Sequence, residues 1–69
     1  MPLSMAPAKV ELTVQRVTGN DKMRQHLNNL GFIDGEPIMV INKVDQNVIV
    51  KIKGVSLAIT CDLANKIFV

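Results

Sequence analysis

Apolar and polar residues alternate along the chain from Val10 to Gln15. A period of two is typical of a strand with one buried face, so we expect a half-buried strand here. The alternation breaks at the next two residues, and the sequence Thr-Gly-Asn-Asp at 18–21 predicts a turn. The preceding segment, residues 1–8, contains two prolines and has no such period. We expect it to form a loose lead-in that covers part of the core.

The period changes after this turn, where Met23, Leu27 and Leu30 follow one another at helical spacing. Residues at i, i+4 and i+7 form one apolar stripe, which predicts a short amphipathic helix. Asn20 or Asp21 is suited to cap its first free amides, because a short side-chain oxygen can accept a hydrogen bond there.

The sequence also predicts where this helix ends. Gly31 fits the C′ position, where a left-handed backbone favours a residue without a Cβ atom. Counting back from it makes Leu27 the C3 residue and Phe32 the C″ residue, a pair whose apolar contact often closes a Schellman motif. The sequence Ile-Asp-Gly-Glu at 33–36 then predicts a turn into the next strand.

Two hairpins are expected after this turn. Residues 38–44 predict a strand whose start is restricted by Pro37. The sequence Asp-Gln-Asn at 45–47 predicts a three-residue loop with its asparagine in the left-handed position. That loop length would pair Val44 with Val48 across the hairpin.

The second hairpin turn is expected at residues 54–55, because a type II′ turn favours glycine first. This register would pair Val50 with Ile59 on the buried face. Lys51 and Lys53 would then point outward, opposite Ala58 and Ser56 respectively. A slip of one residue would bury those lysines, so the buried face is strongly specified.

The chain closes with a single helical turn, expected within residues 60–65, and a short strand at 67–69. The whole pattern predicts a mainly β fold: a small SH3-like β-barrel of about five strands, because closure of a small sheet removes its exposed edges. One short α-helix follows the first strand, and the helical turn precedes the last. We expect residues 1–69 to form a single domain.

Composition indicates the cellular compartment of this domain. Cys61 is the only cysteine, so no disulfide within the chain is available, and a lone thiol favours a reducing cytoplasm. The longest uninterrupted apolar run, residues 38–41, is far shorter than the about 18 residues that predict a membrane span. The first residues show no signal-peptide pattern. We therefore expect a cytoplasmic protein that is not inserted in a membrane.

Candidate catalytic and metal-binding residues are sparse. The chain holds one histidine, His26, one cysteine and two serines, none in a recognisable catalytic arrangement. Gly31 and Gly35 lack the lysine that follows the glycines of a phosphate-binding loop. Cys61 and Asp62 are the only adjacent pair of metal-ligand type, whereas a structural metal site generally uses four ligands. We expect no enzyme activity and no cofactor, and the sparse ligand set disfavours direct binding of a divalent metal ion.

Charge gives little support for a nucleic-acid partner. The net charge of +2 is a weak electrostatic attraction for phosphates. The outward lysines Lys43, Lys51 and Lys53 could form a basic patch, but they fit a solvated strand face better. The two aromatic residues, Phe32 and Phe68, are expected in the core and not as stacking platforms. Without Trp or Tyr, the chain also lacks the aromatic walls that bind proline-rich ligands.

The order of these features resembles the FeoA family of small cytosolic proteins. Three stretches carry the resemblance: RQHLNNLGFIDGEPIMVI at 24–41, VIVKIKGVSLAI at 48–59 and DLANKIFV at 62–69. They show a helix ending in Leu-Gly, an apolar pair, a glycine turn, a hairpin with one glycine and a final Ile-x-Val. The sequence departs from the family pattern at His26, which stands where the family often has a basic residue.

The resemblance implies an SH3-like barrel that serves bacterial ferrous-iron uptake as a non-enzymatic accessory protein. The implied partner is the cytoplasmic G-protein region of a FeoB-type membrane transporter. The same fold unit occurs at the C-terminus of metal-dependent transcriptional repressors, so the alternative is a regulatory or oligomerisation module capable of self-association. The candidate partner contacts are the polar residues around the end of the helix: Arg24, Asn28, Asn29, Asp34 and Glu36.

Overall fold

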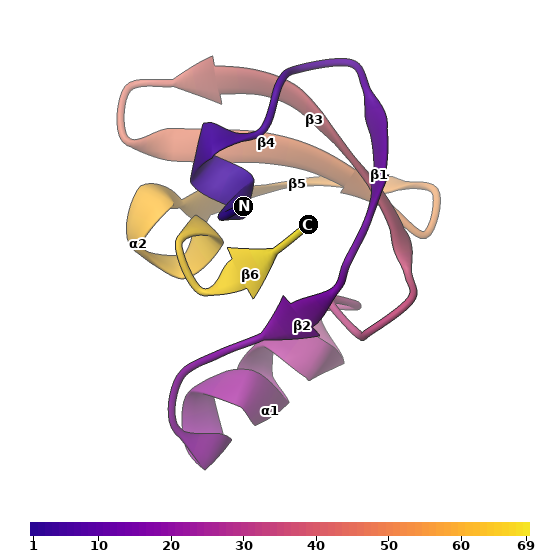
Figure 1. The fold of residues 1–69 in the computed structure, drawn as a ribbon. Helices are drawn as coiled ribbons and strands as arrows, with labels where there is room; N and C mark the ends of the chain where they lie inside the picture. Colours follow the sequence, from indigo (N-terminus) through magenta and orange to yellow (C-terminus); the bar gives the residue numbers. More distant parts are fainter.

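The computed structural model describes residues 1–69 and is mainly β, as predicted. Its strands are β1 (Glu11–Thr13), β2 (Arg16–Val17), β3 (Pro37–Val44), β4 (Asn47–Ile52), β5 (Val55–Thr60) and β6 (Ile67–Phe68). Its α-helices are α1 (Asp21–Asn29) and α2 (Cys61–Ala64), and a 3₁₀ helix spans Leu3–Met5. A four-stranded antiparallel sheet in the order β1-β3-β4-β5 faces a two-stranded sheet of β2 and β6 (Figure 1).

Of the strand expected at 10–15, residues 11–13 form β1 in the larger sheet, and Arg16–Val17, where the predicted alternation breaks, form β2 in the smaller sheet. Leu12 pairs with Ile38 in the larger sheet, whereas Val17 pairs with Ile67 in the smaller one. The chain changes partners at Val14, which is buried and whose amide donates to the carbonyl of Glu36 at 2.9 Å. This bend lets one segment close both sheets around the core, which explains a sixth strand where about five were expected.

The first eight residues, expected as a loose lead-in, include a 3₁₀ helix that packs against the core. Leu3 is fully buried within the core, and Ala6 is almost fully buried. Pro2 forms a bridge with Phe68, and the amino group of Met1 donates to the carbonyl of Val69 at 2.9 Å. The 3₁₀ helix packs against α2 and places Leu3 in the core.

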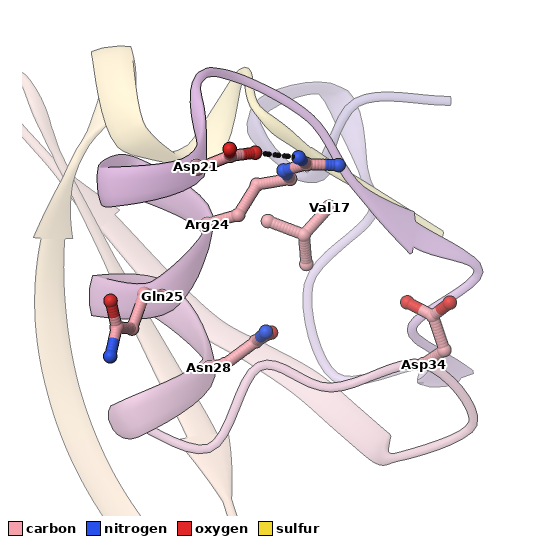
Figure 2. Close-up of a pocket in the computed structure, with 6 residues that line it drawn as sticks. All are labelled: Val17, Asp21, Arg24, Gln25, Asn28 and Asp34. Carbon is pink, nitrogen blue, oxygen red and sulfur yellow. Dashed lines mark hydrogen bonds and ion pairs between the residues drawn. The ribbon is translucent and has the colours of Figure 1, made fainter.

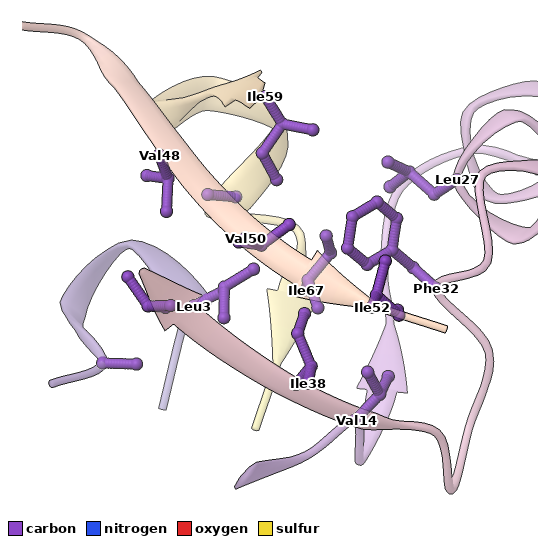
Figure 3. Packing of buried hydrophobic residues seen from close by; sticks show 13 residues of the cluster. Leu3, Val14, Leu27, Phe32, Ile38, Val48, Val50, Ile52, Ile59 and Ile67 are labelled. Carbon is purple, nitrogen blue, oxygen red and sulfur yellow. The ribbon is translucent and has the colours of Figure 1, made fainter. Parts of the chain in front are cut away.

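The core is a single cluster of 13 buried hydrophobic residues (Figure 3). The strands contribute inward-facing side chains such as Val40, Val48 and Val50, and α1 contributes Leu27. Phe32 follows α1 and is also fully buried, as predicted. Because β-branched residues pack well on a pleated surface, this core needs few aromatic residues.

The predicted ends of α1 are confirmed. The side chain of Asn20 accepts a hydrogen bond from the amide of Met23 at 2.8 Å, which caps the helix. Gly31 has a φ of +109° at the other end, and its amide donates to the carbonyl of Asn28 at 3.0 Å. The predicted apolar stripe is incomplete, because Leu30 lies at the C-cap and is 38% exposed.

The first hairpin differs from the expected three-residue loop. Val44 pairs with Asn47 around a two-residue turn, in which Asp45 takes the left-handed conformation with a φ of +55°. Continued without interruption, this register would place Lys51 on the buried face opposite Val40. A β-bulge after Val40 corrects the register, so that Val40 pairs with Val50 and both side chains stay buried.

The second hairpin has a turn of the expected length, but it lies one residue earlier in the chain. Its turn is Lys53-Gly54, with φ values of +52° and +76°, not the expected Gly54-Val55. Two left-handed residues match a type I′ turn, which suits the twist of the flanking strands. Val50 consequently pairs with Leu57 instead of Ile59. A shift of two positions preserves which face is buried, so the predicted core survives the wrong register.

The close of the chain is confirmed. The hydroxyl of Thr60 accepts a hydrogen bond from the amide of Leu63 at 3.3 Å and caps the short helix α2. The last strand follows at Ile67–Phe68, and it pairs with β2.

Candidate functional site

A shallow hollow of about 380 Å³ lies beside α1, and we name it the α1 hollow. Its lining residues come from β2, α1 and the turn after α1 (Figure 2): Val17, Asp21, Arg24, Gln25, Asn28 and Asp34. Five of these six residues are polar or charged, so the hollow can offer hydrogen bonds around a small apolar floor.

The helical wall of the α1 hollow follows from residue spacing. Asp21, Arg24, Gln25 and Asn28 stand at i, i+3, i+4 and i+7, which places them on one face of α1. Leu27 points from another face of the helix into the core, where it is fully buried. Burial of this leucine fixes the rotation of the helix, and the polar face is thereby held toward the hollow.

The opposite wall is the turn at residues 33–36. Gly35 has a φ of +87°, and its amide donates to the carbonyl of Val14 at 2.7 Å. The amide of Glu36 donates to the carbonyl of Ile33 at 3.1 Å and closes the turn. These backbone bonds tie the turn to the neighbouring strand segment, so Asp34 is carried on a fixed support.

The charges of the α1 hollow are unequal. Arg24 forms an ion pair with Asp21 on the same helix, and this pair is exposed to solvent. Asp34 makes no ion pair in the structure. One guanidinium against two carboxylates leaves the lining with a formal charge of −1. The hollow therefore suits a basic or amide-bearing side chain of a protein partner better than an anion.

The structure brings three of the five expected contact residues together: Arg24, Asn28 and Asp34 line the α1 hollow. Asn29 is exposed but lies outside the lining. Glu36 faces away from this site and pairs with Lys53, with 3.0 Å between carboxylate oxygen and Nζ.

Three lining residues were missed from the sequence. Asp21 and Gln25 could have been found, because they share helical spacing with the two expected helix residues. Val17 carried no local signal, since its place in the floor depends on the bend that creates β2.

The remaining polar groups do not assemble into a second site of recognisable chemistry. No group of three or more His, Cys, Asp or Glu side chains is placed to hold a metal ion. The half-buried Cys61 and the exposed Asp62 begin α2. None of the helices has the length and apolar character needed to cross a bilayer.

The aromatic and basic residues give no stacking platform either. Lys43, Lys51 and Lys53 are exposed, as expected, although Lys53 lies in the hairpin turn and not in a strand. Phe68 is only half-buried, contrary to its expected place in the core. Its ring lies beneath the guanidinium of Arg16, 4.7 Å from the ring centroid, so this face is already occupied by a cation–π contact.

Comparison with known proteins identifies the domain. A family model described as the FeoA domain matches residues 1–69. A crystal structure of an iron uptake regulatory protein (FeoA) superposes with a TM-score of 0.88 at 28% sequence identity, over 97% of this chain and 91% of that one. No sequence among the curated proteins matches the chain significantly.

Two further structures are similar in fold. FeoA of Stenotrophomonas maltophilia, a prokaryotic SH3-domain protein solved in complex with zinc, gives a TM-score of 0.84 at 24% identity. The match covers 99% of this chain and 87% of that one. A manganese-dependent transcriptional repressor gives a TM-score of 0.89 at 17% identity, over 100% of this chain and 40% of the repressor. The predicted SH3-like fold is therefore confirmed.

Proposed function

Because the chain belongs to the FeoA family, we propose that it binds the cytoplasmic G-protein region of a FeoB-type ferrous-iron transporter. Family membership makes it a non-enzymatic accessory protein of ferrous-iron transport. Its contribution is then binding, with no chemical step on this chain. The match over all 69 residues is the observation that carries this proposal.

The α1 hollow is the surface that we assign to this contact. Its walls are held by helix capping and by the backbone bonds of the turn, so little conformational entropy is lost when a partner binds. Asp34 supplies an unpaired carboxylate, and Gln25 and Asn28 each supply a donor and an acceptor. Such a set complements a basic side chain flanked by polar groups on the transporter domain.

Binding alone is sufficient to regulate a partner that has two conformations. A ligand that prefers one conformation shifts the equilibrium toward it by its differential affinity. An accessory protein in the cytoplasm would therefore bias the nucleotide cycle or the opening of the transporter. A weak complex suffices when the transporter is concentrated at a membrane.

The proposal is tested by titrating the isotope-labelled chain with the isolated cytoplasmic domain of a FeoB-type transporter. We expect saturable NMR shifts at the amides of α1 and of the turn at 33–36. The outer strand positions of β3 should stay unshifted and serve as an internal control. A flat titration at high micromolar concentration would reject the transporter as partner, and shifts elsewhere would reject the α1 hollow as the contact.

A second candidate is the regulatory or oligomerisation module of a metal-dependent repressor. The shared fold with the manganese-dependent repressor favours it, but that similarity concerns the fold alone. The two candidates differ in their partners. The second candidate would be supported if the chain does not bind the transporter domain but binds a DNA-binding chain of the repressor type.

A further inference from the structure

The strand β5 has a partner along only one edge. It is the last strand of the four-stranded sheet, and β4 is its only strand neighbour (Figure 1). β4 and α2 are the elements that pack extensively against it. The other edge of β5 is therefore free for backbone pairing.

The hairpin register shows which groups occupy this free edge. In a two-residue hairpin the residues flanking the turn form a hydrogen-bonded pair, here Ile52 and Val55. The amide of Cys61 donates to the carbonyl of Gln46 at 2.9 Å, which confirms the same alternation at the far end of the hairpin. Every second residue of β5, beginning with Val55, thus bonds to β4.

The intervening residues Ser56, Ala58 and Thr60 direct their amides outward, and the first two also direct their carbonyls outward. None of these amides and carbonyls has a hydrogen-bond partner among the turns, loops and caps of the chain. The Thr60 carbonyl is not among them, because Thr60 is the N-cap residue and its carbonyl is directed into α2. All three residues are exposed, so the groups are accessible to another strand.

β5 also lacks the features by which natural edge strands avoid association. Its six residues, Val-Ser-Leu-Ala-Ile-Thr, include no charge and no proline, and the strand contains no bulge. Val55 is 57% exposed and Leu57 is half-buried, so apolar surface lies beside the open backbone groups. The other edge strand of the sheet, β1, is shorter and carries Glu11.

We propose that β5 pairs with β5 of a second copy of this chain, as antiparallel strands related by a twofold axis at Ala58. The outward groups are complementary to themselves in this register. The amide of Ala58 donates to the carbonyl of Ala58 in the second copy, and the amide of Thr60 donates to the carbonyl of Ser56. Symmetry repeats each bond, so the amides of Ala58 and Thr60 and the carbonyls of Ser56 and Ala58 are satisfied reciprocally.

The side chains fit the same register. Ala58 faces Ala58 of the second copy, where a small uncharged side chain leaves no repulsion. Leu57 faces Ile59 of the second copy, which covers the half-buried leucine with an apolar neighbour. A copy of the same neutral strand matches this edge better than a charged peptide does.

The contact area predicts a weak dimer. Pairing along five residues of β5, from Ser56 to Thr60, buries less than the roughly 1,200–2,000 Å² of a stable interface. The association should therefore depend on concentration in the micromolar to millimolar range. This surface is separate from the α1 hollow, because the two share no residue.

The test combines sedimentation equilibrium with NMR on the full chain. A concentration-dependent dimer is expected, with slower hydrogen exchange at the amides of Ala58 and Thr60 as concentration rises. A sample mixing labelled and unlabelled chains should show an intermolecular Hα–Hα contact between Leu57 and Ile59, because these residues face each other as a non-hydrogen-bonded pair. A chain that stays monomeric throughout, or a dimer without this contact, overturns the proposal.

Two variants sharpen the test. Ala58→Lys places two ammonium groups opposite each other and should weaken dimerisation about tenfold or more. Ala58→Pro removes the central donor without disturbing β4, since that amide does not bond to β4. Thr13→Lys, at an exposed position of β1 on the other edge of the sheet, is the matched control and should dimerise as the unmodified chain does.

The lysine variant keeps the test decisive if the proline variant fails to fold. Dimerisation unaffected by Ala58→Lys would exclude this edge as the interface. Protection of the Ser56 and Ala58 amides only after the transporter domain is added would identify a different occupant and reject the second copy. Binding to the transporter through the α1 hollow would be unaffected by either result, so the two proposals fail independently.

Discussion

The amide of Phe32 donates a hydrogen bond to the carbonyl of Leu27 across the end of α1, at 3.0 Å between nitrogen and oxygen. Both side chains are fully buried in the core. This pair completes the Schellman motif and turns the chain from the helix toward the segment 33–36. The motif therefore sets the distance between the two walls of the α1 hollow.

The glycine inside this motif is required by its backbone conformation. We expect Gly31→Ala to lower the free energy of unfolding by about 1–2 kcal/mol, because a side chain strains a φ of +109°. A Cβ atom there would also lie 3.4 Å from Cδ of Lys53. Urea unfolding measures the change, with Asn29→Ala as an exposed control. Equal midpoints for Gly31→Ala and the unmodified chain would contradict the requirement for glycine.

The two leucines of the helix provide a matched pair for core packing. Leu27→Ala should destabilise the fold by about 2–5 kcal/mol, because it leaves a cavity in a small core. A core of this size rarely supplies more than about 3–5 kcal/mol, so much of this variant should be unfolded at room temperature. Leu30→Ala, at a residue 38% exposed, should change stability far less. Thermal unfolding followed by circular dichroism separates them, and similar losses would place Leu30 in the core.

The sequence predicted the elements better than their pairing. The period of apolar residues identified α1, the later strands and the buried face, because burial is encoded residue by residue. Register depends on the turn: the first loop was predicted one residue too long, and the second turn was predicted one residue too late in the chain. Asp45 and Lys53 adopt left-handed conformations that their residue types only weakly indicate. The bulge after Val40 was also not predicted from the sequence. It follows from the observed two-residue turn, whose register would bury Lys51 without it.

The sequence predicted only those parts of the candidate site that depend on neighbouring residues in the chain. The polar face of α1 follows from helical spacing, and the turn that carries Asp34 follows from Gly35. The apolar floor of the α1 hollow depends on tertiary contacts, and so does which of the nearby polar residues line it. Glu36 was expected at the site but is turned toward Lys53, and that choice is settled by the neighbouring hairpin.

The Glu36–Lys53 pair should support stability modestly and leave partner binding unchanged. The side chains are 19% and 50% exposed respectively, so solvent screens their attraction. Glu36→Gln should lower the free energy of unfolding by at most about 1 kcal/mol, with a smaller loss at high salt. A double-mutant cycle with Lys53→Gln measures the coupling by urea unfolding. A coupling independent of salt would show that the pair is shielded from solvent, and a loss of transporter binding would place Glu36 in the contact.

Neighbouring asparagines of α1 test which face of the helix meets the transporter domain. Asn28 lines the α1 hollow, whereas Asn29 is exposed outside it. Asn28→Ala should weaken binding about twofold to twelvefold, the loss expected for one hydrogen bond of about 0.5–1.5 kcal/mol. Asn29→Ala should bind like the unmodified chain, and calorimetric titration of both variants against the same domain measures the difference. Because the two substitutions remove the same group from adjacent helical positions, changes in helix propensity cancel between them. Equal losses for both variants, or a larger loss for Asn29→Ala, would move the contact away from the α1 hollow.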